Sequence, residues 1–115
     1  MTMTEQHDLE GLTALVTGAT SGIGRATAGE LARRGARLVV HGRNPDHGAA
    51  VVDSITAEGG SARFAAADLG DPAGPGDLVR QAGPVDLLVN NAGFAPKASY
   101  ITGAVIAADG GRTAI

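Results

Sequence analysis

The sequence predicts an α/β fold in which helices cover both faces of a parallel sheet. Short apolar segments of strand length alternate along the chain with longer segments of helical periodicity. Glycines mark most of the changes from one kind of segment to the other. Regular alternation is typical of βαβ units, whose crossovers are right-handed and whose strands run parallel. The units share no sequence period, so we predict a doubly wound sheet and not a repeat array.

Four strands are predicted in the first part of the chain, and one more near its end. Residues 12–16 are apolar and bounded by glycines, which suits a short strand buried on both faces of a parallel sheet. Equivalent segments follow at 37–41, 61–67 and 85–89, and the last predicted strand is 103–108. Only about a dozen residues without a helical pattern connect the last two strands, which is the lower limit for a parallel crossover. We therefore expect antiparallel pairing with the fourth strand, or exchange with a second chain, either of which covers an exposed sheet edge.

Three helices are predicted between these strands. The first covers residues 22–34 and is followed by a glycine that suits a helix end. The second covers residues 45–58, with proline at its first position and two glycines after it. The third lies within residues 71–82. We expect it to begin only near Gly76 or Asp77, because the prolines and glycines before them disfavour its first turns.

Composition limits the class of protein. The chain has 115 residues, of which 43% are hydrophobic, enough for one domain with one core. The formal net charge is −3 and the basic residues are scattered, so no nucleic-acid partner is expected. Cysteine is absent, which excludes disulfides and thiolate metal sites and fits a reducing cytoplasmic location. Residues 1–10 form a polar, flexible lead-in without a secretory pattern, and no apolar run reaches membrane-spanning length.

The segment from Thr17 to Gly24 has the pattern of a phosphate-binding loop. It joins a predicted strand directly to a predicted helix, so backbone N–H groups at the positive end of the helix dipole point to one place. Gly18 suits a tight turn, Gly22 leaves room for a pyrophosphate, and Gly24 allows the helix to pack close to the strand. The alternative is an ordinary glycine-rich connection, but the order of strand, loop and helix favours phosphate binding.

The spacing of these glycines, G-x-x-x-G-x-G with Thr17 ahead, resembles the short-chain dehydrogenase/reductase family. Two further stretches, Asp68-Leu69 and Asn90-Asn91-Ala92-Gly93, strengthen the resemblance because each follows an apolar run. Residues 99–115 look like the last strand and tail of such enzymes. The resemblance implies a Rossmann-like fold, a dinucleotide cofactor, and hydride transfer between NADP(H) and an alcohol or carbonyl substrate.

The resemblance also implies which residues bind the dinucleotide. The Asp68 carboxylate would meet the adenine amino group, with the Leu69 backbone beside it. Residues 90–93 would brace the sheet and pass beneath a cofactor ribose. Without the resemblance, Asp68 is interpreted as a cap for the next turn, and the two asparagines as a strand-ending turn. The predicted cofactor-binding residues are Gly18, Thr20, Ser21, Gly22, Ile23, Gly24, Arg43, Asp68, Leu69, Asn90, Ala92 and Gly93.

The end of the second predicted strand bears on the choice between NAD and NADP. An acidic residue there would accept hydrogen bonds from the adenosine ribose of NAD, but the chain has Gly42 followed by Arg43. Because an arginine offers two donors to a 2′-phosphate, NADP is the predicted cofactor. The alternative is a solvated turn arginine, with Gly42 present for its backbone φ angle.

The three histidines, His7, His41 and His47, have neither metal-ligand spacing nor a companion nucleophile. They are interpreted as surface or strand residues. No metal site is predicted.

The catalytic residues that the resemblance implies are missing. The family uses a tyrosine as proton donor or acceptor, with a lysine four residues later that lowers the pKa of the tyrosine. Here Tyr100 is the only tyrosine, Lys97 is the only lysine, and Ala104 stands four residues after Tyr100. No catalytic residue is therefore predicted. Residues 94–115 are interpreted as a tail and last strand, joined to a dinucleotide-binding half (residues 11–93) after the loss of a central segment.

Three interpretations of the function follow. The first is a nucleotide-binding protein derived from an NADP-dependent oxidoreductase and inactive as it stands. The second is an active NADP-dependent reductase whose longer chain contains the central segment and takes a small-molecule substrate. The third is a non-enzymatic nucleotide-binding or assembly module. Because the sheet would be unfinished, a homo-oligomer is also expected. The sequence does not indicate the substrate.

Overall fold

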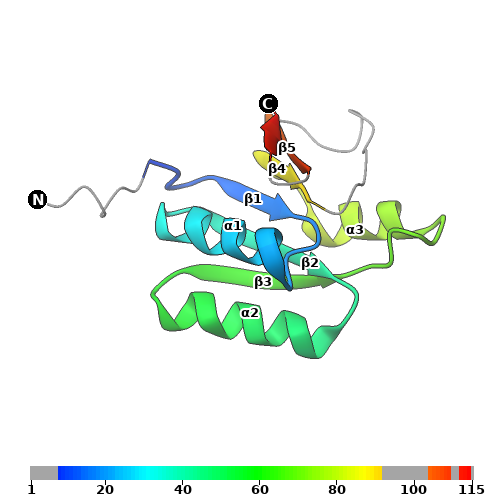
Figure 1. Cartoon of the computed structure of the whole chain (residues 1–115), viewed down its shortest axis with the longest axis horizontal. Coiled ribbons are helices and arrows are strands. Elements are labelled where there is room, and N and C mark those ends of the chain that lie inside the picture. Colours follow the sequence, from blue (N-terminus) through cyan, green and yellow to red (C-terminus); the bar gives the residue numbers. More distant parts are fainter. Residues whose placement is uncertain (1–7, 92–103, 110–111, 115) are drawn as a thin grey trace, which may run out of the picture.

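The computed structural model describes residues 8–91, 104–109 and 112–114, and it contains a six-stranded sheet (Figure 1). The strands lie in the order β3-β2-β1-β4-β5-β6. Neighbouring strands run parallel except β5 and β6, which pair antiparallel. The predicted α/β fold with a parallel sheet is confirmed. The strands are β1 (Thr13–Val16), β2 (Arg37–Gly42), β3 (Ser61–Ala66), β4 (Leu87–Asn90), β5 (Ala104–Asp109) and β6 (Arg112–Ala114).

The first two helices, α1 (Gly22–Arg33) and α2 (Pro45–Ala57), agree with the prediction to within one residue. Asn44 begins α2 because its side-chain oxygen accepts hydrogen bonds from the N–H groups of Asp46 and His47, at 2.8 and 3.3 Å. No helix in the described parts of the chain has the length and the apolar character needed to cross a membrane.

The predicted start of the third helix was wrong. Helix α3 (Gly74–Ala82) begins before Gly76, with a proline in its first turn. Pro75 is tolerated there because the first N–H groups of a helix have no intrahelical acceptor in any case. Gly74 is buried, and a Cβ on it would collide with the backbone oxygen of Asp68. The glycine that argued against a helix therefore allows this helix to pack against the preceding loop.

The pairing of the C-terminal strand also corrects the prediction. Strand β5 runs parallel to β4, in a register from Leu87↔Ala104 to Asn90↔Ala107, and not antiparallel. Strand β4 has only four residues, so a parallel β5 requires the connection to return only about 13 Å, from the end of β4 to the level of its start. The segment between Asn90 and Ala104 reaches on the order of 40 Å when extended, which suffices without a helix. Strand β6, which was not predicted, then pairs with the outer edge of β5.

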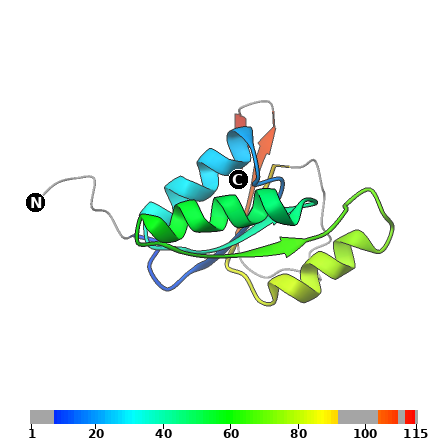
Figure 2. The same ribbon diagram turned by 90° about the horizontal axis from the view of Figure 1, so that it is seen from below.

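The sheet has helices on both faces. Figure 2 shows α1 and α2 on one face and α3 on the other. Alternate residues of β1 point to opposite faces, so Ala14 and Val16 pack under α1 and α2, whereas Leu15 packs under α3. The last turn of α3 is fixed to β3 because the Arg63 guanidinium donates to two carbonyls of that turn, each at 2.7 Å. This packing brings the carboxyl ends of the parallel strands to one edge.

Candidate functional site

The glycine-rich loop between β1 and α1 has the backbone that its sequence predicts. Gly18 and Gly22 each have a φ of +59°, in the left-handed region that favours glycine. Gly24 is buried, and a Cβ placed on it would collide with the backbone oxygen of Gly18 and lie 2.6 Å from Asn91 Nδ2. The first two glycines therefore permit turns, and the third permits a close approach of α1 to the end of β1.

The start of α1 is open to the solvent. Ser21 precedes the helix in an extended conformation, and its side chain forms no cap. The N–H groups of the first turn lack intrahelical acceptors and are not satisfied by Ser21. Together with the helix dipole, they favour an anion at this place. Ile23 lies in the same turn with 49% of its surface exposed, and it is the one large apolar side chain exposed to that degree among the described residues.

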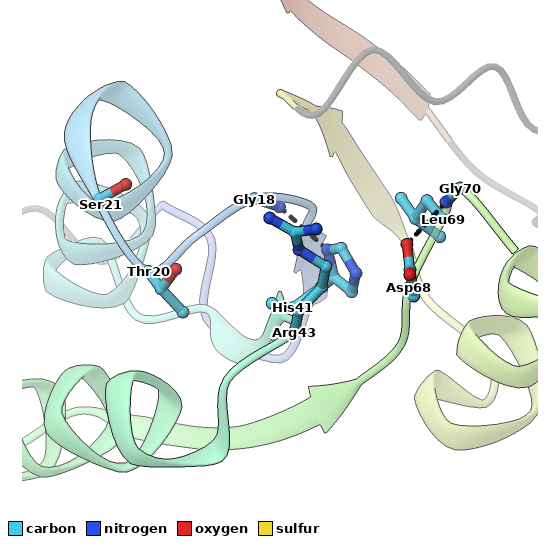
Figure 3. Close-up of a pocket in the computed structure, with 9 residues that line it drawn as sticks. Gly18, Thr20, Ser21, His41, Arg43, Asp68, Leu69 and Gly70 are labelled. Carbon is cyan, nitrogen blue, oxygen red and sulfur yellow. Dashed lines mark hydrogen bonds between the residues drawn. The ribbon is translucent and has the colours of Figure 1, made fainter.

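A pocket of about 440 Å³ lies at this edge of the sheet (Figure 3). Its walls come from the loop after β1, the end of β2 and the loop after β3. Such a volume is within the range of small-molecule sites. The predicted site residues that line it are Gly18, Thr20, Ser21, Arg43, Asp68 and Leu69, and the lining residues that were not predicted are His41, Gly42 and Gly70.

Four other described residues of the predicted site do not line this pocket. Gly22, Ile23 and Gly24 form the first turn of α1, next to the pocket-lining Ser21. Asn90 ends β4 and does not line the pocket. Ala92 and Gly93, which were also predicted, lie outside the described residues, and so do Lys97 and Tyr100, for which no site role was predicted.

Gly42 is needed for space and not for its φ angle. Its φ is not positive, so the alternative that explained Gly42 by its backbone angle was wrong. A Cβ on Gly42 would lie 2.6 Å from Thr20 Cγ2, so glycine lets the end of β2 approach the loop after β1. Arg43 follows directly, exposed and at the pocket wall.

Asp68 lines the pocket and also caps the loop that follows it. Its Oδ1 accepts a hydrogen bond from the Gly70 N–H at 2.9 Å (dashed in Figure 3). Asp71 makes the same kind of bond with the Ala73 N–H, also at 2.9 Å. The interpretation of Asp68 as a turn cap is confirmed. Because Asp68 also lines the pocket, a role in ligand binding is compatible with the cap.

His41 is the site residue that sequence reasoning missed. It is a strand residue, as predicted, but it is only 3% exposed and lines the pocket. Its Nδ1 accepts a hydrogen bond from the Gly18 N–H at 3.0 Å, and its Nε2 lies 2.9 Å from the Ala67 carbonyl oxygen. Burial lowers the pKa of His41, partly offset by the bond to the Ala67 carbonyl. A polar residue directly after a run of buried apolar residues was the available signal.

The end of β4 is tied to β1 by two asparagines and a threonine. The fully buried Thr17 donates through Oγ1 to Asn90 Oδ1 at 3.3 Å and accepts from the Asn91 N–H at 2.9 Å. Asn91 also donates through Nδ2 to the Gly18 carbonyl at 3.0 Å. Asn90 and Asn91 thus brace the sheet beneath the glycine-rich loop. Asn91, which was not among the predicted site residues, makes the direct contact with that loop.

No metal centre is found in the described part of the chain. Within residues 8–91, 104–109 and 112–114, no three His, Cys, Asp or Glu side chains gather closely enough to hold a metal ion. The arrangement instead offers backbone N–H groups and one exposed guanidinium around a pocket, which suits an anionic ligand.

Comparison with known proteins places this arrangement in a family. The family model described as short chain dehydrogenase matches residues 12–105. Among curated proteins, the uncharacterized oxidoreductase YvaG of Bacillus subtilis (strain 168) is 41% identical over 95 residues, which are 81% of this chain and 36% of YvaG.

Two solved structures share the fold. The angucycline C-6 ketoreductase LanV with bound NADP is 41% identical with a TM-score of 0.71, over 77% of this chain and 39% of LanV. The 3-oxoacyl (acyl-carrier-protein) reductase from Agrobacterium tumefaciens C58 with NADP bound is 44% identical with a TM-score of 0.71, over 80% of this chain and 37% of the reductase. The Rossmann-like fold class is therefore confirmed.

The chain spans a little over a third of the length of these relatives. The family match, residues 12–105, contains strands β1 to β4, the glycine-rich loop and the residues that line the pocket. Since the family match extends over most of the chain, the protein belongs to the short-chain dehydrogenase family.

Proposed function

We propose that this chain binds NADP through the pocket at the carboxyl ends of β1, β2 and β3, as the nucleotide-binding half of an oxidoreductase. The observation that carries the proposal is the meeting of the glycine-rich loop with Arg43 and Asp68 around one pocket of about 440 Å³. In open parallel sheets, ligands bind beyond the carboxyl ends of the strands. LanV and the 3-oxoacyl reductase are relatives whose structures hold NADP.

The described residues fit the adenosine and phosphate parts of such a cofactor. The uncapped first turn of α1 offers N–H donors to the pyrophosphate, and the space beside Gly22 is empty. Asp68 uses Oδ1 for its turn, so Oδ2 is the atom proposed to accept the adenine amino group. When bound, the nicotinamide of NADP(H) would supply or accept the hydride in the family's reaction.

Arg43 is proposed to select NADP over NAD. It is exposed at the pocket wall and follows Gly42, at the place where an acidic residue would bind the ribose of NAD. A guanidinium binds a phosphate with paired, charge-assisted hydrogen bonds. The 2′-phosphate is the group that distinguishes NADP from NAD, so the preference follows from this one side chain.

The test is Arg43→Ala, measured by titration calorimetry with NADPH and with NADH. We expect roughly a 10- to 100-fold loss of NADPH affinity, because hydrogen bonds to a charged group are lost, and little change for NADH. Arg37→Ala is the matched control, since Arg37 is exposed at the opposite end of β2. Equal losses for both nucleotides would contradict the assignment of Arg43.

We propose further that these residues bind the cofactor without turning over a substrate. The sequence has no tyrosine followed four residues later by a lysine, and residues 94–115 are proposed to join the nucleotide-binding half after the loss of a central segment. Two alternatives remain. An active reductase would contain the central segment in a longer chain, whereas an assembly module would bind nucleotide or a partner without any reaction.

The intact mass of the natural protein separates these alternatives. A mass of 11.4 kDa, with NADPH binding and no turnover of alcohols or ketones, is the expected result. A substantially larger mass would contradict the loss of the central segment and favour an active NADP-dependent reductase. Sedimentation of the same sample in the presence and absence of NADPH would test the proposed homo-oligomer.

A further inference from the structure

We infer that His41 is a positioning residue of the dinucleotide site, because its imidazole joins the ends of β1 and β3 and fixes the Gly18 peptide. The inference rests on the proposed function, since the loop that His41 holds is the one proposed to bind the pyrophosphate. His41 is the last but one residue of β2, between the two strands whose ends it joins, and it is only 3% exposed.

His41 forms hydrogen bonds with the segments that follow the two neighbouring strands, β1 and β3. Its Nδ1 accepts from the Gly18 N–H at 3.0 Å, and its backbone carbonyl accepts from the Ala19 N–H at 2.8 Å. On the other side its Nε2 lies 2.9 Å from the carbonyl oxygen of Ala67, whose N–H donates to the Gly42 carbonyl at 3.1 Å. One residue thus holds two consecutive amides of the glycine-rich loop and the chain just beyond β3.

These partners define one protonation state of the imidazole. The Gly18 N–H is a donor, so Nδ1 must be unprotonated, and the Ala67 carbonyl is an acceptor, so Nε2 must carry the hydrogen. A protonated ring would turn an Nδ1–H group against the Gly18 N–H and break that bond. Burial, which lowers the pKa of His41, favours the neutral ring. The charged side chains that line the same pocket are Arg43, after β2, and Asp68, after β3.

Gly18 is held from two sides. Its N–H donates to His41 of β2, and its carbonyl accepts from Asn91 Nδ2, just after β4, at 3.0 Å. Gly18 has a φ of +59°, which glycine adopts readily because it has no Cβ, and the two side-chain bonds limit the conformational freedom that glycine otherwise has. The course of the chain through Thr20 and Ser21 into α1 is therefore set before a ligand binds, which lowers the entropic cost of binding.

The same contacts decide which amides are left for a phosphate. The N–H groups of Gly18 and Ala19 are both bonded to His41, through its ring and its carbonyl. The phosphate donors of the loop must therefore come from the amides beyond Ala19. The role assigned to His41 is to hold the first two amides, so that the later ones keep their direction.

The first test is NMR of the ¹⁵N-labelled chain of 115 residues without ligand at neutral pH. We expect a scalar coupling between the Gly18 amide nitrogen and His41 Nδ1, transmitted through the hydrogen bond, and an imidazole protonated at Nε2. A ring protonated at Nδ1, or a Gly18 amide without the coupling, would overturn the inference whether or not the chain binds NADPH.

The second test compares NADPH affinity in two variants. His41→Leu removes both side-chain bonds at similar volume, and we expect roughly a tenfold loss of affinity because the Gly18 N–H and the Ala67 carbonyl are left unpaired. His41→Gln keeps one acceptor and one donor, and it should recover most of the loss. His47→Leu is the matched control, since His47 is exposed in the first turn of α2, and it should bind as the wild type does.

The outcomes separate the two proposals. If His41→Leu is folded and binds NADPH as tightly as the wild type, the positioning role is refuted and the proposed function stands. If the wild type itself does not bind NADPH, the proposed function is refuted, and the coupling between Gly18 and His41 decides the positioning role. If His41→Leu fails to fold, the His41→Gln variant decides. An NADPH affinity near that of the wild type supports the inference, and a loss of about tenfold or more overturns it.

Discussion

The carboxyl ends of β1, β2 and β3 differ from those of β4 and β5 in what surrounds them. The first three converge on a pocket whose walls come from the loop after β1, the end of β2 and the loop after β3. Side chains join these segments to one another, with His41 between Gly18 and Ala67. The end of β4 contributes asparagines that face β1 and its loop, and no described residue after β4 or β5 lines this pocket.

This difference supports the proposal that nucleotide binding needs the ends of β1, β2 and β3 and not the far side of the sheet. The family resemblance implies a catalytic tyrosine and lysine in a central segment. The 115 residues of this chain contain no tyrosine followed four residues later by a lysine. The contacts proposed for adenosine and pyrophosphate need only the first three strand ends and the brace from β4. A chain with this half alone is therefore expected to bind a dinucleotide and to leave a substrate unchanged.

The largest effect is expected from Gly24→Ala, which breaks the contact between the binding half and the end of β4. The added Cβ would collide with the Gly18 backbone oxygen and approach Asn91 Nδ2. We expect the free energy of unfolding to fall by about 2–3 kcal/mol in urea denaturation. Gly29→Ala is the control on the same helix, because its Cβ would meet only Arg33 Nη1 at 3.7 Å. It should raise the free energy of unfolding by about 0.5–1 kcal/mol. Similar losses in both variants would contradict the role of Gly24.

A smaller effect is expected from Gly22→Asp, which tests whether the phosphate lies at the start of α1. A carboxylate beside the first turn would repel the pyrophosphate, and we expect NADPH affinity to fall about tenfold or more in titration calorimetry. The left-handed φ of Gly22 adds strain in any variant, so Gly22→Asn is the neutral control of the same shape. If both variants lose affinity equally, the loss comes from the backbone and the phosphate does not lie there.

The smallest effect is the pH dependence of the free energy of unfolding, which tests the contribution of His41 to the ends of β1, β2 and β3. Because the pKa of His41 in the folded chain lies below the value of 6.5 in the unfolded chain, the unfolded state binds the extra proton first. The stabilisation is complete above pH 6.5 and decreases as the pH falls from there through the folded pKa. Urea unfolding at a series of pH values should show this loss in the wild type and a weaker one in His41→Gln. Identical profiles would mean that His41 does not contribute to the pH dependence of the free energy of unfolding.

Much of the fold could be predicted because it depends on local signals. Apolar runs of strand length and the glycine and proline positions located β1 to β4, α1 and α2 to within two residues. The start of α3 was missed because Gly74 and Pro75 disfavour a helix interior, yet both are accepted in a first turn packed against Asp68. The direction of β5 was missed because a connection of about a dozen residues was taken as too short for a parallel return, whereas a strand of four residues needs only about 13 Å.

The candidate site was predicted only where a residue type carries its own chemistry. Glycine loops, a strand-end arginine and a strand-end aspartate pointed to the residues that the pocket brings together. His41 was not selected because its partners Gly18 and Ala67 lie more than twenty residues away, although a polar residue after an apolar run was a local signal. Asn91 stood within the stretch predicted to brace the sheet, but its contact with Gly18 exists only in the folded chain. Gly42 was recognised as unusual, but its reason, the nearby Thr20 methyl group, exists only in the folded chain.

The parallel pairing of β5 with β4 has a consequence for what the sheet can accept between these two strands. The two strands are joined by backbone hydrogen bonds in a continuous register from Leu87↔Ala104 to Asn90↔Ala107. Because β5 already runs in the direction of the strands before it, further strand–helix units inserted after Asn91 would push it outward without reversing it. Units added at this joint would therefore leave the three strand ends around the pocket in place.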